Sequence, residues 1–191
     1  MNYYVVKYTG PFGFIKPWTA VRDSETFSQQ FLTPSIVEGM EKKLFPELLG
    51  VKGIQKIKRH RLAYLQVSAQ QEQIQPRGWN VKSKHAERPY AITVRSVLLN
   101  PTLYLAFDSE EDAQIALTQH LCLCRNEDIV FPQNIEKVSA QVFDEDEENY
   151  AGYELIFEKK DQSFLVGYNR FNEAKPMYGW LKVLGNPVKS F

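Results

Sequence analysis

The sequence predicts an α+β fold built on a βαββαβ unit of the ferredoxin-like, RRM-like kind, and three observations support this prediction. Segments typical of strand, helix, strand, strand, helix and strand follow one another along residues 1–143. The chain of 191 residues is 43% hydrophobic, enough for one sizeable core with a smaller appended part. A basic, polar stretch near residues 54–90 is ill suited to that core, so we expect it to project as an arm.

The first strand and the first helix have clear local signals. Tyr3–Tyr8 is rich in β-branched and aromatic residues and ends at a Thr-Gly-Pro turn, so it predicts a strand. Phe12–Leu32 shows no sustained period and predicts a long loop. Thr33 is then a good N-cap, and Pro34 suits the first helical position, where its missing N–H costs nothing. The expected core face of this helix carries Ile36, Val37, Met40 and Leu44.

The second strand region carries charge on both faces. Along Ile54–Val67, one face would hold Lys56, Lys58 and His60, and the other Arg59 and Arg61. A strand with one face buried should not carry these charges, so we expect the ribbon to project beyond the core. The polar stretch Ser68–Gly78 would continue it as a flexible arm, and Trp79–Arg88 would lead the chain back.

The remaining elements of the unit follow in order. Tyr90–Leu99 alternates, with Tyr90, Ile92, Val94 and Leu98 on one face, and predicts a half-buried strand. Leu103–Phe107 resumes the strand after a proline. Asp108 or Ser109 would cap a second helix, whose acidic first turn suits the helix dipole. Val138–Phe143 would supply the closing strand.

The C-terminal part predicts a β extension of this unit. The acidic run Asp144–Glu148 reads as a solvated loop, and Tyr153–Phe157 with Phe164–Tyr168 as a hairpin. We therefore expect a domain over residues 1–143, with its arm at about 54–90, and an acidic loop with a C-terminal β-hairpin extension over 144–191.

Charge is distributed unevenly along the chain. The formal net charge is zero, but residues 1–100 carry a net +8 and residues 101–191 a net −8. The segment Lys52–Arg95 contains ten basic residues and only two acidic ones, Glu72 and Glu87. This segment is therefore expected to meet a polyanion.

Several functional classes lack support in the sequence. We see neither a secretory signal nor a run long enough to span a bilayer, so we expect a soluble cytoplasmic protein that contacts no membrane. Cys122 and Cys124 are expected to be small buried hydrophobes, without disulfides or a metal site. No phosphate-binding glycine loop, nucleophile elbow or catalytic carboxylate pair is evident, so we predict no cofactor and no conventional enzyme.

Three motifs give the chain a resemblance to a known family. Gly10-Pro11-Phe12, Pro17-Trp18-Thr19 and Phe31-Leu32-Thr33-Pro34-Ser35 with Gly39 resemble the N-terminal signature of CRISPR-associated protein family 5, in the RAMP superfamily. Ile54–Tyr64 and Ala91–Phe107 resemble the second- and third-strand regions of that family. The resemblance covers about residues 1–110.

The resemblance implies a ferredoxin-like core with a protruding β-hairpin thumb, and a ribonucleoprotein role in antiviral defence. Such a subunit caps the 5′ handle of crRNA in a type I Cascade complex. The implied partners are the crRNA and the other Cascade subunits, above all the repeated backbone subunit. Target DNA near the PAM is a further candidate partner.

We predict eleven RNA-binding residues, most of them cations that would contact phosphates. Trp79, in a basic arm, would stack on an unpaired base. The alternatives are a solvated strand face for the cations of Ile54–Val67, a surface ion pair for the loop arginine, and packing at the base of the arm for the tryptophan. The predicted residues are Arg22, Lys56, Lys58, Arg59, Arg61, Arg77, Trp79, Lys82, Lys84, His85 and Arg88.

Catalysis is the main alternative to a binding role. Some members of the family cut precursor RNA without metal, using a Tyr/Lys/His set. Gln29 stands where they carry the tyrosine, and Lys84-His85 precedes the third-strand region, whereas their Lys-His pair follows it. We therefore expect a non-catalytic subunit. A metal-independent endoribonuclease and a protein-binding adaptor without RNA remain the alternatives.

Overall fold

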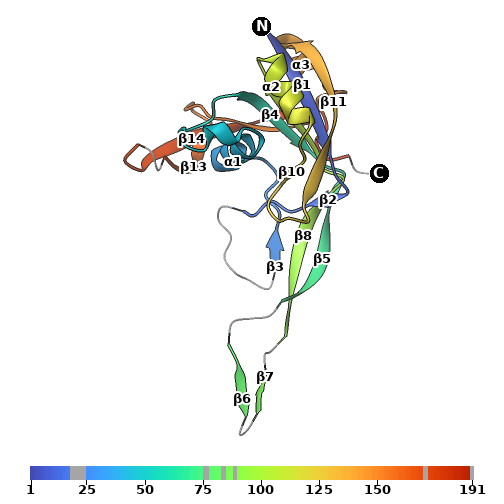
Figure 1. Ribbon diagram of the computed structural model, residues 1–191, viewed down its shortest axis with the longest axis vertical. Helices are drawn as coiled ribbons and strands as arrows, with labels where there is room; N and C mark the ends of the chain where they lie inside the picture. Colours follow the sequence, from blue (N-terminus) through green and yellow to red (C-terminus); the bar gives the residue numbers. More distant parts are fainter. Residues whose placement is uncertain (18–24, 75–77, 83–84, 88–89, 170–171, 190–191) are drawn as a thin grey trace.

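The computed structural model describes residues 1–17, 25–74, 78–82, 85–87, 90–169 and 172–189. Its body contains an eight-stranded sheet with the order β10-β11-β1-β9-β4-β12-β14-β13. The strands are β1 (Asn2–Thr9), β4 (Ile57–Ala63), β9 (Thr102–Phe107), β10 (Leu121–Cys122), β11 (Ile129–Ser139), β12 (Gly152–Ile156), β13 (Phe164–Asn169) and β14 (Lys175–Leu184). A long arm extends from this body (Figure 1).

The predicted fold class is confirmed by four neighbouring strands of the sheet. Strands β1, β4, β9 and β11 alternate along the chain with α1 (Pro34–Leu44) and α2 (Glu110–Leu117) in the order βαββαβ. In the sheet they lie in the order β11-β1-β9-β4, and every pairing among them is antiparallel. Numbered along the unit, this order is 4-1-3-2, as in ferredoxin-like domains.

Both predicted helix starts are confirmed, because each is set by a local signal. Helix α1 begins at Pro34 directly after Thr33, and in α2 the Ser109 Oγ accepts a hydrogen bond from the Asp112 N–H at 3.3 Å. The predicted closing strand Val138–Phe143 is wrong. Strand β11 ends at Ser139, whose hydroxyl caps a third helix, α3 (Ala140–Glu145), by accepting from the Val142 N–H at 3.1 Å.

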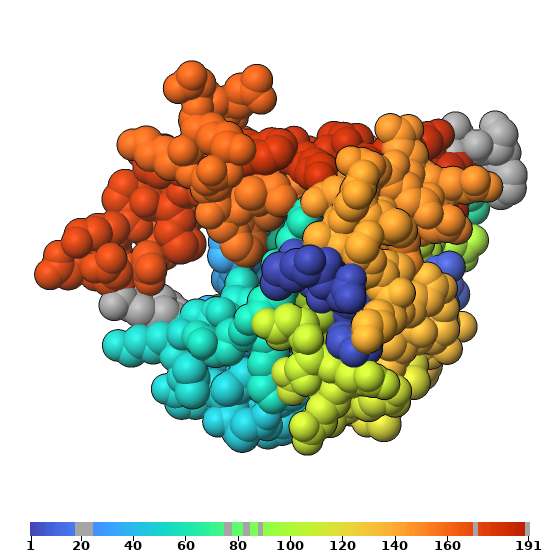
Figure 2. All heavy atoms as spheres, turned by 90° about the horizontal axis from the view of Figure 1, so that it is seen from above, coloured from blue at the N-terminus to red at the C-terminus, as the bar shows by residue number. Residues whose placement is uncertain are grey.

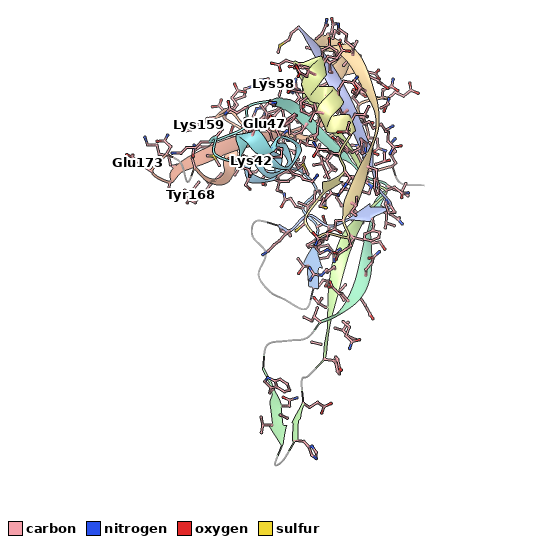
Figure 3. The ribbon with its side chains drawn as sticks, in the orientation of Figure 1. Lys42, Glu47, Lys58, Lys159, Tyr168 and Glu173 are labelled. Carbon is pink, nitrogen blue, oxygen red and sulfur yellow. The ribbon has the colours of Figure 1, made fainter. Side chains whose placement is uncertain are left out.

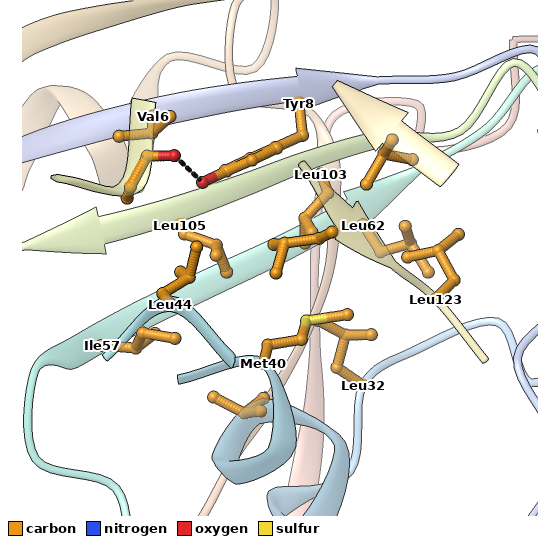
Figure 4. Packing of buried hydrophobic residues seen from close by; sticks show 14 of the residues in the cluster. Val6, Tyr8, Leu32, Met40, Leu44, Ile57, Leu62, Leu103, Leu105 and Leu123 are labelled. Atoms are coloured by element: carbon orange, nitrogen blue, oxygen red, sulfur yellow. Dashed lines mark hydrogen bonds between the residues drawn. The ribbon is translucent and has the colours of Figure 1, made fainter. Parts of the chain in front are cut away.

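The core lies on both faces of the sheet. On one face, α1 and α2 pack against alternate residues of β1, β4 and β9, and the Tyr8 hydroxyl donates to the Ala116 carbonyl at 2.7 Å (Figure 4). On the other face, Tyr3, Val5 and Tyr104 pack against Phe143 of α3 and against Tyr150. Because successive residues of a strand face opposite sides, β1 and β9 each contribute to both clusters.

The arm is a two-stranded ribbon formed by β5 (Gln66–Ile74) and β8 (Ala91–Leu99), paired at nine positions from Gln66↔Leu99 to Ile74↔Ala91. Strands β6 (Asn80–Lys82) and β7 (His85–Glu87) form a small hairpin at its tip (Figure 1). Near the body, β2 (Phe12–Gly13) and β3 (Glu25–Phe27) pair with β8, within the segment expected to be one long loop. A short 3₁₀ helix, η1 (Pro46–Leu48), follows α1.

Two expectations about the arm are corrected. The projecting ribbon begins near Gln66 and not near Ile54, and the stretch expected to be flexible is a regular strand over Ser68–Ile74. In β8 the alternation correctly predicts a strand, but its outer half is inverted: Tyr90 and Ile92 are exposed, whereas Thr93 is buried. These apolar side chains of the outer arm are exposed to solvent, which an alternation pattern alone does not reveal.

The C-terminal segments continue the main sheet. The predicted hairpin of Tyr153–Phe157 with Phe164–Tyr168 is wrong, because β14 lies between β12 and β13. Strand β12 also pairs with β4, at Tyr153↔Leu62. The space-filling view from above shows β13 and β14, in orange and red, protruding to one side of the body (Figure 2).

Two further expectations concern small features. Cys122 is half-buried and Cys124 exposed, and both are free thiols, so the expected burial is wrong for Cys124. Cys124 follows the end of β10, where the chain turns outward. In the part of the chain that the structure describes, no helix has the length and apolar character needed to cross a membrane.

Candidate nucleic-acid interface

The two arginines of β4 lie in the middle of the sheet and are paired with carboxylates. Arg61 has no exposed side-chain surface, and its Nε lies 3.3 Å from Oε2 of the buried Glu154. Arg59 also binds Glu154, with Nη2 2.8 Å from Oε2. Asp144 completes the group, with its Oδ1 2.7 Å from Arg59 Nη2 and 3.2 Å from Arg61 Nη2.

Additional contacts explain how the sheet accommodates these charges. The Phe143 ring lies 4.0 Å from the Arg61 guanidinium carbon, and Arg61 Nη1 donates to the carbonyls of Phe143 and Tyr150. Lys182 Nζ binds Asp144 Oδ1 at 2.7 Å. We call these five charged residues, Arg59, Arg61, Asp144, Glu154 and Lys182, the ionic cluster. The expectation that charges on both faces exclude β4 from the core is therefore wrong, since paired and hydrogen-bonded charges can be buried.

The pKa shifts of Asp144 and Arg59 favour their charged forms, whereas burial lowers the pKa of Arg61. Burial opposes ionisation of Asp144, but hydrogen bonds from Arg59 and Lys182 outweigh it and lower the pKa of this carboxyl to about 2. Burial likewise opposes the charge on Arg59, yet its bonds to Glu154 and Asp144 raise its pKa. Asp144 was expected in a solvated loop, and it lies instead in α3 against these cations.

The two lysines of the predicted row also have partners within the body. Lys56 Nζ lies 2.8 Å from Asp112 Oδ1, 3.0 Å from Glu47 Oε1 and 4.0 Å from the Phe45 ring centre. Lys58 donates to the Gln55 carbonyl at 2.6 Å and lies 3.4 Å from Asp108 Oδ2. In Figure 3, Lys58 and Glu47 lie on the body, far from the arm. The four cations of Lys56–Arg61 therefore all have partners within the body, and with Arg61 buried they do not form a single exposed row.

The arm exposes a different kind of chemistry. Trp79 beside the tip hairpin is 57% exposed, Tyr90 at the return is 66% exposed, and Ile92 is 64% exposed. His85 is exposed on β7. The predicted residues Arg22, Arg77, Lys84 and Arg88, with Trp18 of the family motif, lie outside the described residues, as does the side chain of Lys82. Of the predicted residues whose side chains the structure describes, Trp79 and His85 are both exposed, and both lie near the tip of the arm.

At the base of the arm, two arginines that sequence reasoning missed tie it to the body. Arg95 of β8 donates to Glu72 of β5, and Arg125 Nη1 lies 3.5 Å from the same carboxylate. Both guanidinium groups lie over the Phe14 ring, at 5.4 and 5.6 Å. Asp128, which is fully buried, binds Arg125 Nη2 at 2.8 Å. No local sequence signal links either arginine to Glu72, because these partners lie far apart along the chain, whereas the Arg125–Asp128 pair is local.

Gln29, His60 and His85, which bear on the cleavage alternative, lie in different parts of the fold. Gln29 is buried, with its backbone N–H donating to the Ile15 carbonyl at 2.8 Å. His60 is buried against the Phe157 ring with no hydrogen-bond partner at Nε2, and burial lowers its pKa to about 4. His85 lies on the arm, apart from both. Within the described ranges, no group of three or more His, Cys, Asp or Glu could hold a metal ion.

Comparison with solved structures finds a protein of similar fold. The chain is similar in fold to a solved chain described as a CRISPR RNA-guided surveillance complex, with a TM-score of 0.54 and 13% sequence identity, over 97% of this chain and 91% of that chain. At this identity the likeness shows the fold alone, an α+β fold with a ferredoxin-like core. No protein-family model matches the sequence, and no curated protein matches it.

Proposed function

We propose that the chain is a non-catalytic subunit of a type I CRISPR surveillance complex that caps the 5′ handle of crRNA and contacts the adjacent backbone subunit. The observation that carries this proposal is the fold similarity to a chain of an RNA-guided complex over nearly the entire length. The N-terminal motifs, which resemble CRISPR-associated protein family 5, support it independently of the fold.

The chemistry of the arm supports an RNA contact there. Exposed indole and phenol rings, such as those of Trp79 and Tyr90, suit stacking on unpaired bases, which contributes roughly 1–3 kcal/mol per base. The sequence also places Arg77, Lys82, Lys84 and Arg88 between β5 and β8. Cations in such a segment can neutralise phosphates and release counterions. We therefore assign the RNA contact to the arm and not to β4.

Binding of a fluorescently labelled, single-stranded repeat RNA, followed by anisotropy, tests this function. We expect binding that weakens steeply between 50 and 200 mM salt, and Trp79→Ala to weaken it about 5- to 100-fold by removing a stacking surface. Tyr168→Ala is the matched control, because Tyr168 is 63% exposed but lies on β13, away from the arm (Figure 3). Salt-independent binding, or equal affinities for the two variants, would contradict the assignment.

A further inference from the structure

One face of β14 carries two aromatic side chains, each with a lysine over its ring. Tyr178 and Trp180 are two residues apart in the strand, so their side chains lie on the same face of the sheet. Lys159 Nζ is 4.8 Å from the Tyr178 ring centre, and Lys160 Nζ is 4.7 Å from the Trp180 ring centre. We call these four residues the β14 platform.

Both rings border open space. A hollow of about 630 Å³ adjoins Tyr178, and its lining includes Phe157, Met177 and Lys175. A second hollow, of about 470 Å³, is lined by Trp180, Lys160, Asp161 and Gln162. Both volumes fall within the roughly 300–1,000 Å³ of small-ligand sites, so each can accept a planar group the size of a nucleobase.

The spacing of the two rings suits an unstacked single strand. Residues two apart in a strand are separated by about 6.6 Å, twice the roughly 3.4 Å per nucleotide of a stacked strand. Each ring can therefore bind one base of an extended strand. In a continuously stacked strand, the spacing of neighbouring bases would not match the spacing of the two rings. Leu165 and Ile156, which pair with Tyr178 and Trp180, support the rings from the neighbouring strands.

The lysines suit the phosphates of the same strand. Stacking of a base on an exposed ring is generally stronger than an exposed cation–π contact, so a base can displace the ammonium group from the ring. Lys159 has no ion pair among the described residues, and it can turn to a phosphate without breaking one. Lys160 is paired with Glu158 at 2.9 Å, and the same carboxylate accepts the Trp180 Nε1–H at 3.4 Å.

We propose that the β14 platform is a second binding surface for single-stranded nucleic acid, which takes two nucleotides and acts independently of the arm. It lies on the protruding C-terminal part of the sheet, in the half of the chain that is acidic overall, where charge alone would not place a polyanion. In Figure 3, Lys159, in the segment between β12 and β13, lies far from the tip of the arm.

Tryptophan fluorescence tests the proposal. In a Trp18→Phe/Trp79→Phe background Trp180 is the remaining tryptophan, and eight-nucleotide oligo(U) and oligo(dT) are titrated separately. We expect saturable quenching that weakens with salt, and at least fivefold weaker binding in Tyr178→Ala and in Lys159→Ala/Lys160→Ala. Tyr168→Ala should leave the affinity unchanged. Tighter binding of oligo(U) would identify RNA as the occupant, and tighter binding of oligo(dT) would identify DNA.

The test of the β14 platform can be separated from the test of RNA binding by the arm. No quenching, or quenching that the surface lysine pair variant leaves unchanged, would overturn the platform; that variant removes only exposed contacts, so the fold is retained. The loss of repeat-RNA affinity on Trp79→Ala, measured by anisotropy, reports on the arm, whereas quenching of Trp180 reports on the platform. Platform binding that persists in this variant supports two separate surfaces, whereas its loss there would show that the platform does not act by itself.

Discussion

Two arginines in the central strand β4 are stabilised by carboxylates from the C-terminal part of the chain. Glu154 and Asp144 lie more than 80 residues away from Arg59 and Arg61 along the sequence, and they reach them because β12 pairs beside β4 and α3 packs on the same face. The ionic cluster thus joins the last strands to the ferredoxin-like unit. Breaking one of its pairs should leave an uncompensated charge in the interior.

Glu154→Gln tests this role of the ionic cluster. We expect the free energy of unfolding in urea to fall by about 3–5 kcal/mol, because Arg61 would keep a buried charge without its main partner. Lys58→Ala is the control, since its ion pair with Asp108 is partly exposed and should contribute about 0–1 kcal/mol. A loss below 1 kcal/mol in Glu154→Gln would show that the buried pair is not needed for the fold.

His60 should make stability depend on pH between about 4 and 6.5. Burial lowers its pKa in the folded protein to about 4, so the unfolded chain binds a proton first as the pH falls. The free energy of unfolding is therefore unaffected by protonation of His60 above pH 6.5, and it falls as the pH drops toward 4. In His60→Gln, urea unfolding measured at steps of pH should show a flatter profile over this window. An unchanged slope would mean that another group causes the dependence.

Sequence patterns could not predict that the β4 cations are paired within the body, for a physical reason. A charge on a strand is expected to face solvent unless a partner is known, and here the partners come from residues 144 and 154. Thr33 and Ser109 were predictable because a helix cap depends on neighbours within three or four positions. Residue-level predictions therefore succeeded where the determining contacts are local.

Among the elements, the arm is the one on which the proposed RNA contact depends. The stretch that contains β5 was correctly expected to project, but its partner β8 was expected to be a half-buried strand of the core unit, and the sequence did not reveal where the projection starts. Both depend on how far the body covers β8, which is a tertiary property. Trp79 could be placed in an exposed, basic context from the sequence alone, whereas Arg95 and Arg125 required the structure.

The loop before α1 bears on the question of RNA cleavage. It holds the buried Gln29, whose amide cannot act as a general acid or base near neutral pH, and His85 lies on the separate arm. Precursor repeat RNA incubated with the purified protein in EDTA should therefore remain intact on a denaturing gel. Specific cleavage at the handle boundary that His85→Ala abolishes would establish the endoribonuclease alternative.

Across the whole molecule, the two oppositely charged halves of the sequence neutralise each other inside the body. Acidic side chains from the second half pair with the basic second-strand region: Asp112 with Lys56, Asp108 with Lys58, Asp144 with Arg59, and Glu154 with both arginines. The basic residues of the arm segment are separate from this pairing in sequence, between β5 and β8. An overall net charge of zero is therefore compatible with a local polyanion contact.

Crosslinking tests most directly the central claim that the arm holds the RNA. Repeat RNA containing photoreactive 4-thiouridine is bound to the full chain, irradiated and digested, and the crosslinked peptides are identified by mass spectrometry. The account predicts crosslinks within residues 66–99, above all near Trp79 and Tyr90, and none within residues 57–63 of β4. Crosslinks concentrated in β4 or in residues 144–148, with none in the arm, would contradict it.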